Sequence, residues 1–210
     1  MEYPPIGTPM MRWDVINFLI SKYRYSRYLE IGVAAGETFD KVKCAIKHSV
    51  DPNDVVPPTF KMTSDQFFAS RTSGVDPLGA YSYDIIFIDG LHERAQVIKD
   101  VDNSLAALSE TGTIVVHDCL PEVEGQQIMP YPNLGWWTGD VWKAIVDLRT
   151  RTDLSVYVVD VDWGCGIIRR GNQPPIQLPQ ELSWKYYTEH KKELLSPVSV
   201  TQFFEREFNG

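Results

Sequence analysis

The sequence predicts an α/β fold: a Rossmann-like, doubly wound sheet of seven mostly parallel strands, the last of them antiparallel, with helices on both faces. Two segments, Tyr83–Asp89 and Gly112–Asp118, each contain a continuous apolar run, as expected for parallel strands covered on both sides. Their final residues are 29 positions apart, close to the ~30 residues of one βαβ unit. Near the C-terminus, Leu154–Val161 and Gly164–Arg169 read as strands joined by a short turn, which indicates an antiparallel hairpin at one sheet edge.

The N-terminal part of the chain supplies the first helix and three further strands. The patterns predict a helix over Arg12–Tyr23 and strands over Tyr25–Ile31, His48–Asp51 and Phe60–Thr63. A helix with Ile46 on its apolar face is expected between the first two of these strands. Pro57 and Pro58 fall in the short segment before the third strand, so the crossover helix usually found there is expected to be missing.

The C-terminal half is expected to add three helices and no second domain. One helix lies between the two apolar strands, one begins at about Thr138, and a charged one covers Trp184–Leu195. We therefore expect a single domain over residues 1–210, with residues 1–24 as an N-terminal helical extension and residues 172–210 as a C-terminal tail.

The composition limits the kinds of partner. Among 210 residues, 43% are hydrophobic, and 28 acidic against 20 basic residues give a formal net charge of −8. Such a field repels phosphate backbones and anionic lipid surfaces, so we expect a small-molecule partner and neither nucleic acid nor a membrane. The apolar runs are far shorter than the ~20 residues that span a bilayer, and the N-terminus does not read as a signal peptide. A cytoplasmic protein is expected, and a homo-oligomer is left open.

Cysteine usage gives no sign of a disulfide framework or a zinc site. Cys44, Cys119 and Cys165 are an odd number without CxxC spacing, so we assign them no chemistry.

Polar side chains collect where the predicted strands end. In an open α/β sheet, ligands bind beyond the carboxyl ends of the strands, so these residues are expected to meet on one rim. In chain order they are Glu30, Gly32, Asp51, Thr63, Ser64, Asp89, His92, His117 and Asp118.

The turn after the first strand carries a resemblance to a known family. The segment Tyr28–Gly36 resembles the first motif of class I S-adenosylmethionine-dependent methyltransferases, in which an acidic residue precedes a glycine-rich turn. The family's acidic residue at the end of the second strand matches Asp51, and the terminal hairpin matches the family's reversed last strand. Four further motifs resemble a compact branch of small-molecule methyltransferases: Met62–Asp65, Ile88–His92, Val116–Pro121 and Gly139–Lys143. The resemblance covers roughly residues 25–171.

The resemblance implies S-adenosylmethionine as the cofactor. A turn built from Gly32, Ala34 and Gly36 would let the ligand approach the backbone closely. Asp51 would accept hydrogen bonds from the ribose hydroxyls, and Glu30 would help to hold the cationic methionine end. The cofactor-binding residues implied beyond these are Ser64 or Asp65, at the adenine edge, and Asp89.

The last strands resemble the catalytic segments of catechol-type O-methyltransferases. This implies Asp89 and Asp118 as ligands of a divalent metal such as Mg²⁺ or Mn²⁺, and His92 as the base that accepts the proton of a hydroxyl. His117 stands where those enzymes have an oxygen ligand, which leaves room for a softer metal or none. The expected reaction is O-methylation of a small hydroxylated metabolite or sugar.

Several of these residues have plain structural alternatives. The glycine turn can serve packing alone, Asp51 can make a turn, and Ser64 or Asp65 can cap a helix. His92 can likewise cap the helix beside it, and His117 can be hydrogen-bonded beneath the site. The loop Leu120–Thr138 is long enough to act as a lid, with Trp136 and Trp137 as an aromatic wall. For Trp142, within a helix, packing is favoured.

Three other functions remain open at this point. A nicotinamide-dependent oxidoreductase is disfavoured because Ala34 replaces the second glycine of the dinucleotide fingerprint. A metal-dependent hydrolase would use the aspartates and histidines of the last strands on an activated water. A noncatalytic module would keep the cofactor pocket without turnover.

Overall fold

A mixed eight-stranded sheet organises the chain, in the order β3-β2-β1-β4-β5-β7-β6-β8. The computed structural model describes residues 9–72, 81–133, 135–178 and 181–209; residues 1–8 of the expected N-terminal extension and residues 179–180 and 210 of the expected tail lie outside them. The strands are β1 Arg27–Ile31, β2 Ile46–Asp51, β3 Phe60–Lys61, β4 Tyr83–Ile88, β5 Leu108–Val116, β6 Leu154–Val159, β7 Cys165–Arg170 and β8 Pro197–Val198. The helices are α1 Arg12–Tyr23, α2 Glu37–Lys41, α3 Ser64–Thr72, α4 Arg94–Ala107, α5 Val141–Leu148, α6 Trp184–Leu195 and α7 Val200–Asn209, with a 3₁₀ turn, η1, at Glu124–Gln127.

The strand directions confirm the predicted doubly wound sheet. Strand β7 runs antiparallel to both of its neighbours, β5 and β6, whereas the other pairings are parallel. The sheet has eight strands instead of the expected seven because β8 adds to the edge strand β6. A two-residue strand that begins with proline has no alternating pattern to detect, and proline is tolerated there because an edge strand needs no second row of hydrogen bonds.

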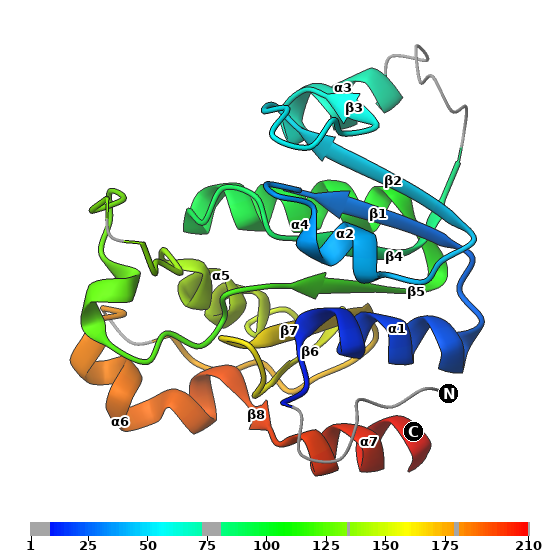
Figure 1. Cartoon of the computed structure of the whole chain (residues 1–210). Coiled ribbons are helices and arrows are strands. Elements are labelled where there is room, and N and C mark those ends of the chain that lie inside the picture. The colour runs from blue at the N-terminus through cyan, green and yellow to red at the C-terminus, as the bar shows by residue number, and fades with distance from the viewer. Residues whose placement is uncertain (1–8, 73–80, 134, 179–180, 210) are drawn as a thin grey trace.

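Helices cover both faces of the sheet, as predicted. Figure 1 shows α1 in front of the sheet and α4 behind it; α7 packs with α1, and α5 packs with α4. Alternate residues of one strand enter the two cores: Ile86 packs with the group that includes α4 and α5, and Phe87 packs with the group that includes α1 and α7. No helix within the described ranges is both long and apolar enough to cross a membrane.

The segment from β1 to α3 departs from the prediction at the helix after Gly36 and at the cap of α3. The helix after Gly36 ends at Lys41, and Ile46 begins β2 instead of lying on a helix face. No helix connects β2 to β3, as expected from the two prolines. Helix α3 is capped by Thr63, not by Ser64 or Asp65.

The cap of α3 is a reciprocal pair of side-chain bonds. The Gln66 N–H donates to Thr63 Oγ1 at 3.2 Å, and the Thr63 N–H donates to Gln66 Oε1 at 3.0 Å. This capping box satisfies the free N–H groups of the first turn. The side chains of Ser64 and Asp65 are therefore free of the capping role.

The C-terminal residues are part of the core. Helix α7 buries Phe203 and Glu207, and the Glu207 carboxylate accepts hydrogen bonds from Tyr157, Tyr23 and Arg169 at 2.7–2.8 Å. The sequence reading treated this segment only as a tail, because its contacts are with residues far away in the chain.

Candidate active site

A cavity of about 550 Å³ opens at the carboxyl ends of β1, β2 and β4, within the size range of small-molecule sites. Six of the predicted cofactor-binding residues line it: Gly32, Ala34, Asp51, Ser64, Asp65 and Asp89. Glu30 and Gly36 are not among its lining residues. The remaining lining residues include Ile31, Val55 and Leu91, which give it apolar surface, and Gln96 and Asp100 from α4.

The turn after β1 is shaped by backbone contact. Gly32 has φ +85°, and a Cβ atom there would lie 2.1 Å from the Asp89 carbonyl oxygen. Glycine is thus required at this position because the ends of β1 and β4 touch, in addition to any need of a ligand. Gly36, at φ +78°, precedes α2, where a Cβ would only contact Val56 at 3.4 Å.

Asp51 holds the turn and also faces the cavity. Its Oδ2 accepts the N–H groups of Val33 and Ala34 at 2.8 and 3.1 Å, and its Oδ1 accepts the N–H of Asn53 at 2.8 Å. Burial disfavours the charged form, but these N–H donors outweigh it and hold the Asp51 pKa below its ordinary value. Because a carboxylate offers about four acceptor positions, Asp51 can still accept a bond from a ligand hydroxyl.

Ser64 and Asp65 tie α3 to α4 at the far side of the cavity. Gln96 Nε2 donates to Ser64 Oγ and to Asp65 Oδ1, both at 3.2 Å. Lys99 Nζ lies 2.6 Å from Asp65 Oδ2. Both residues line the cavity, so the contacts with α4 fix their positions at its wall.

Glu30 is a buried acid beside the turn. Its side chain accepts a hydrogen bond from the Tyr28 hydroxyl, and the residue is 1% exposed. Burial, opposed by that hydrogen bond and reinforced by the negative charge of Asp89, raises the Glu30 pKa to about 8. A cation brought near Glu30 would favour its ionised form.

This raised pKa predicts a pH-dependent stability that Glu30→Gln should remove. An unfolded glutamate ionises near pKa 4.5, so between about pH 4.5 and 8 the folded state holds a proton that the unfolded state has lost. The free energy of unfolding should therefore fall as pH rises through this window, by up to about 1.4 kcal/mol per pH unit. Glutamine stays neutral and can keep the bond from Tyr28, so the variant should lack this fall.

Urea unfolding at several pH values between about 5 and 8 measures the difference. Glu193→Gln, at an exposed position of α6, is the matched control and should follow the wild type. Parallel curves for wild type and Glu30→Gln across the window would contradict the buried-acid interpretation.

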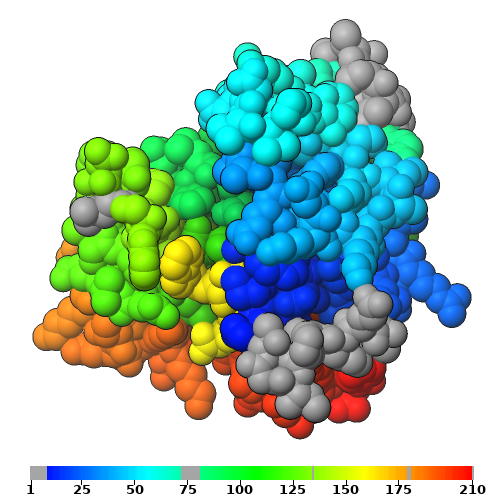
Figure 2. Space-filling view, viewed as in Figure 1, coloured from blue at the N-terminus to red at the C-terminus, as the bar shows by residue number. Residues whose placement is uncertain are grey.

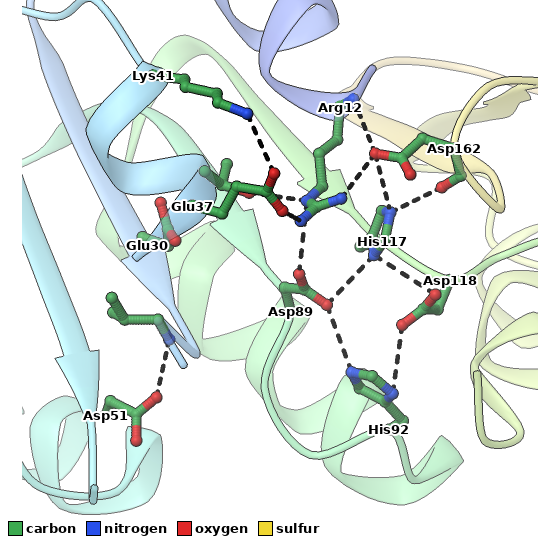
Figure 3. A network of polar contacts seen from close by, with 12 residues as sticks. Arg12, Glu30, Glu37, Lys41, Asp51, Asp89, His92, His117, Asp118 and Asp162 are labelled. Carbon is green, nitrogen blue, oxygen red and sulfur yellow. Dashed lines mark hydrogen bonds and ion pairs between the residues drawn. The ribbon is translucent and has the colours of Figure 1, made fainter. Parts of the chain in front are cut away.

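The predicted catalytic residue, His92, and the three predicted metal ligands, Asp89, His117 and Asp118, meet beside the cavity, as Figure 3 shows. Asp89 Oδ1 lies 3.3 Å from His92 Nε2 and 3.3 Å from His117 Nδ1. On the other side, Asp118 Oδ2 lies 3.2 Å from His92 Nδ1. Burial disfavours the charged form of Asp89, but His117 and His92 outweigh it and lower its pKa. The parallel strands β4 and β5 bring these residues together because their carboxyl ends meet at one edge.

His92 is oriented by contacts with three residues: Asp89, Asp118 and Trp137. Beyond the two aspartates, its Nδ1 lies 3.2 Å from the Trp137 carbonyl oxygen, and its ring stacks on the Trp137 indole with centroids 5.4 Å apart. Burial lowers the His92 pKa, but Asp89 and Asp118 outweigh it and raise the pKa above its ordinary value. Helix α4 begins at Arg94, its N-cap residue is Glu93, and the Arg94 N–H donates to Asp140 Oδ1 at 2.6 Å, so His92 does not serve as the N-cap.

His117 lies deeper, and Asp162 holds it from below. Its Nε2 donates to the Asp162 carbonyl at 2.7 Å, and its Nδ1 points toward Asp89 and Asp118. Burial disfavours the charged ring, but Asp89, Asp118 and Asp162 outweigh it and raise the His117 pKa well above 6.5. In the part of the chain that the structure describes, the ligand atoms that cluster closely enough for a metal come from Asp89, His92 and Asp118. This geometry favours His92 over His117 as a metal ligand.

A divalent metal fits the donors at this place. One ligand atom each from Asp89, His92 and Asp118 lie within 4.8 Å of one another. Asp118 Oδ1 is buried, and in the described part of the chain no hydrogen bond reaches it; the His117 Nδ1 atom is 3.4 Å away. Asp118 also has φ +61°, a conformation that costs energy in a residue with a side chain. Mixed carboxylate and imidazole donors suit manganese or iron better than magnesium.

The sequence reading missed two charged residues of this network, Arg12 and Asp162. Arg12 Nη1 donates to Asp162 Oδ2 at 2.8 Å, across 150 positions of the chain. Asp162 lies in the turn between β6 and β7, where Asp162 and Trp163 both have positive φ. Asp162 could have been found from its place after β6. This strand runs parallel to the central strands, so the polar residue at its carboxyl end lies at the same rim of the sheet.

The loop Leu120–Thr138 contains both site and packing residues. Trp142, just after it, is fully buried, and its indole N–H donates to Gln127 at 3.3 Å, so packing is confirmed for this residue. Trp136 is 71% exposed and lies 6.3 Å from the Trp163 ring. Figure 2 shows the yellow β6–β7 turn at the surface between the green loop and the blue α1. Residue 134 of the loop lies outside the described residues, and the lid role stays a prediction.

Comparison with known proteins agrees with this architecture. Residues 29–119 match the model of a family described as a methyltransferase domain. No curated protein has a sequence that matches this chain.

Solved structures show the same fold at low sequence identity. An O-methyltransferase from Bacillus cereus in complex with SAH (S-adenosylhomocysteine) is 10% identical, with a TM-score of 0.57 over 80% of this chain and 84% of the other. An SAH-bound methyltransferase from Podospora anserina is 16% identical, with a TM-score of 0.54 over 77% and 78%. The O-methyltransferase of tomaymycin synthesis from Streptomyces achromogenes, in complex with SAM, is 13% identical, with a TM-score of 0.53 over 80% and 83%. Residues 29–119 of this chain are therefore similar to a methyltransferase domain, and the chain shares the fold of these solved methyltransferases.

Proposed function

We propose that this protein transfers the methyl group of S-adenosylmethionine to a hydroxyl group of a small molecule. The observation that carries the proposal is the position of Asp89. This residue lines the cavity expected for the cofactor and also contacts His92, the candidate proton acceptor. One carboxylate thus joins the binding cavity to the group that handles the proton, which is the juxtaposition that O-methylation needs.

The cavity residues fit the parts of the cofactor. Asp51, ionised and fixed by backbone N–H groups, accepts a hydrogen bond from a ribose hydroxyl. Ser64 and Asp65 lie at the wall nearest α4 and face the adenine. Glu30, beside the turn, responds to the positive charge at the methionine end by releasing its proton.

The chain's remaining task is to position the acceptor and take its proton. The cofactor supplies a methyl group that its sulfonium already activates; the methyl carbon bonds to the acceptor oxygen as its bond to sulfur breaks. His92, in its neutral form, accepts the hydroxyl proton, and Asp89 and Asp118 stabilise the imidazolium that results. The stacked Trp137 ring limits the rotation of His92 and keeps it aimed. Alignment of the acceptor in this way lowers the barrier by several kcal/mol.

If a divalent metal binds, Asp89, Asp118 and one histidine would hold it. The donor set and the unbonded Asp118 oxygen support this proposal. The ion would acidify the acceptor hydroxyl. His92 would then be a ligand instead of the base. The acceptor class that we propose remains a small hydroxylated metabolite or sugar.

A ligand panel tests the proposed function. The melting temperature is measured with SAH, NADH, Mg²⁺ and Mn²⁺ added singly, since a ligand that binds the native state stabilises it by mass action. SAH at about 100 times its dissociation constant should add about 2.7 kcal/mol, which corresponds to a rise of about 5–10 °C for a chain of this length. Stabilisation by NADH and not by SAH would indicate an oxidoreductase. Stabilisation by metal alone would indicate a hydrolase.

A further inference from the structure

Arg12 places a permanent positive charge beside the turn that follows β1. Its side chain is 15% exposed and is held from three sides: Nε donates to Thr38 Oγ1 at 2.7 Å, Nη1 to Asp162 Oδ2 at 2.8 Å, and Nη2 to Glu37 Oε2 at 3.2 Å. These partners belong to α2 and to the β6–β7 turn. The guanidinium is therefore fixed at the rim, although it comes from the first residue of α1.

The guanidinium lies next to one end of the cavity. Its Nε is 4.0 Å from Asp89 Oδ2, and Figure 3 shows it above Asp89 and between Glu37 and Asp162. Asp89 lines the cavity, and its backbone touches Gly32 of the turn. A ligand that extends along the turn toward Asp89 thus ends near Arg12.

Without Arg12, the acidic side chains at this end of the cavity would repel the carboxylate of a ligand. Asp89, Asp162 and Glu37 are all in contact with Arg12, and Glu30 lies buried nearby. These acids suit the sulfonium and ammonium groups of S-adenosylmethionine, but they repel its carboxylate. Arginine keeps its charge at any physiological pH, whereas the two histidines of the site can lose theirs.

The Arg12 guanidinium also has N–H groups that these three partners do not use. It carries five N–H hydrogens, and three of them have partners in the part of the chain that the structure describes. One N–H remains on each of Nη1 and Nη2. Two such donors form the fork that binds a carboxylate through both of its oxygens.

We infer that Arg12 binds the carboxylate of the cofactor's amino-acid end, while Glu30 and Asp89 face its positive groups. This inference rests on the proposed function. The competing explanation is that Arg12 only ties α1 to α2 and to the β6–β7 turn. The two explanations differ in which ligand should lose affinity when Arg12 is changed.

Calorimetric titration with two ligands separates them. SAH carries the amino-acid end, whereas 5′-methylthioadenosine has the same adenosine and sulfur without it. Arg12→Gln should weaken SAH binding about 10- to 100-fold, because a charge-assisted bidentate contact is lost. Binding of 5′-methylthioadenosine should stay within about 3-fold of the wild type, since it never uses Arg12. Arg27→Gln, at the opposite end of β1, is the matched control and should change neither constant.

The outcomes are distinguishable. Equal weakening of both ligands, or no weakening of SAH, overturns the role of Arg12 and leaves the proposed function intact. A wild-type protein that binds neither ligand overturns the proposed function together with this inference. If Arg12→Gln does not fold, Arg12→Lys gives the same test: lysine keeps a charge but not the fork, so SAH should weaken about 3- to 10-fold and 5′-methylthioadenosine should not. Equal effects on both would again overturn the inference.

Discussion

His92→Gln should lower the rate of methyl transfer by about 10²- to 10⁴-fold, the usual contribution of a positioned general base. Glutamine is close to histidine in size and can hydrogen-bond to Asp89 and Asp118, but it cannot accept the hydroxyl proton. SAH affinity should stay within about 3-fold, because His92 is not among the residues that line the cavity in which we propose the cofactor binds. The measurement is acceptor-dependent SAH formation, with an acceptor first identified from a panel of hydroxylated compounds.

The matched control is His190→Gln, on α6 and outside the Asp89–His92–Asp118 cluster, which should keep wild-type activity. Full activity of His92→Gln would remove the proton-acceptor role. An equal loss of SAH binding and turnover would show that the side chain acts on the cofactor site instead. If added Mn²⁺ binds the wild type and not the variant, His92 is a metal ligand.

Glu207→Ala should destabilise the protein by about 3–5 kcal/mol, because it leaves a mostly buried Arg169 guanidinium without its partner. The Glu207 side chain is 1% exposed, and its oxygens accept bonds from Arg169, Tyr157 and Tyr23. In the variant Arg169 would keep its bond to Thr113 Oγ1 but would lose the carboxylate that balances its charge. For a chain of this length the melting temperature should fall by about 6–20 °C. Denaturant unfolding at neutral pH measures the free energy directly.

Glu205→Ala provides the comparison for this effect. Glu205 is exposed on the same helix, so its loss should change stability by no more than about 0.5 kcal/mol. If the two variants were equally stable, α7 would not depend on the buried charge cluster. The expected result would show that the bonds from Glu207 to Tyr157 of β6 and Arg169 of β7 stabilise the packing of α7 on the sheet.

The central strands and the rim residues could be predicted because their signals are local. Continuous apolar runs identify β4 and β5 as buried parallel strands, and the polar residue that follows each run must then lie at the carboxyl edge. Asp89, His92 and Asp118 meet for that reason. The prolines before β3 likewise fix the missing crossover helix, since proline disrupts helix hydrogen bonding within its own segment.

Tertiary structure decided which of the rim residues touch and which additional residues join them. Arg12 and Asp162 are 150 positions apart, and no periodicity or spacing links them; the packing of α1 beside the β6–β7 turn does. The same is true of Glu207 and Arg169, 38 positions apart on a helix and a strand. The sequence by itself determined the strands and the edge at which the chemistry gathers, because hydrophobic period and strand ends are properties of short segments. Which charged side chains pair with each other was decided only by the folded chain. An ion pair requires a short distance between two side chains, and for residues far apart in the sequence that distance is fixed only when the helices pack on the sheet.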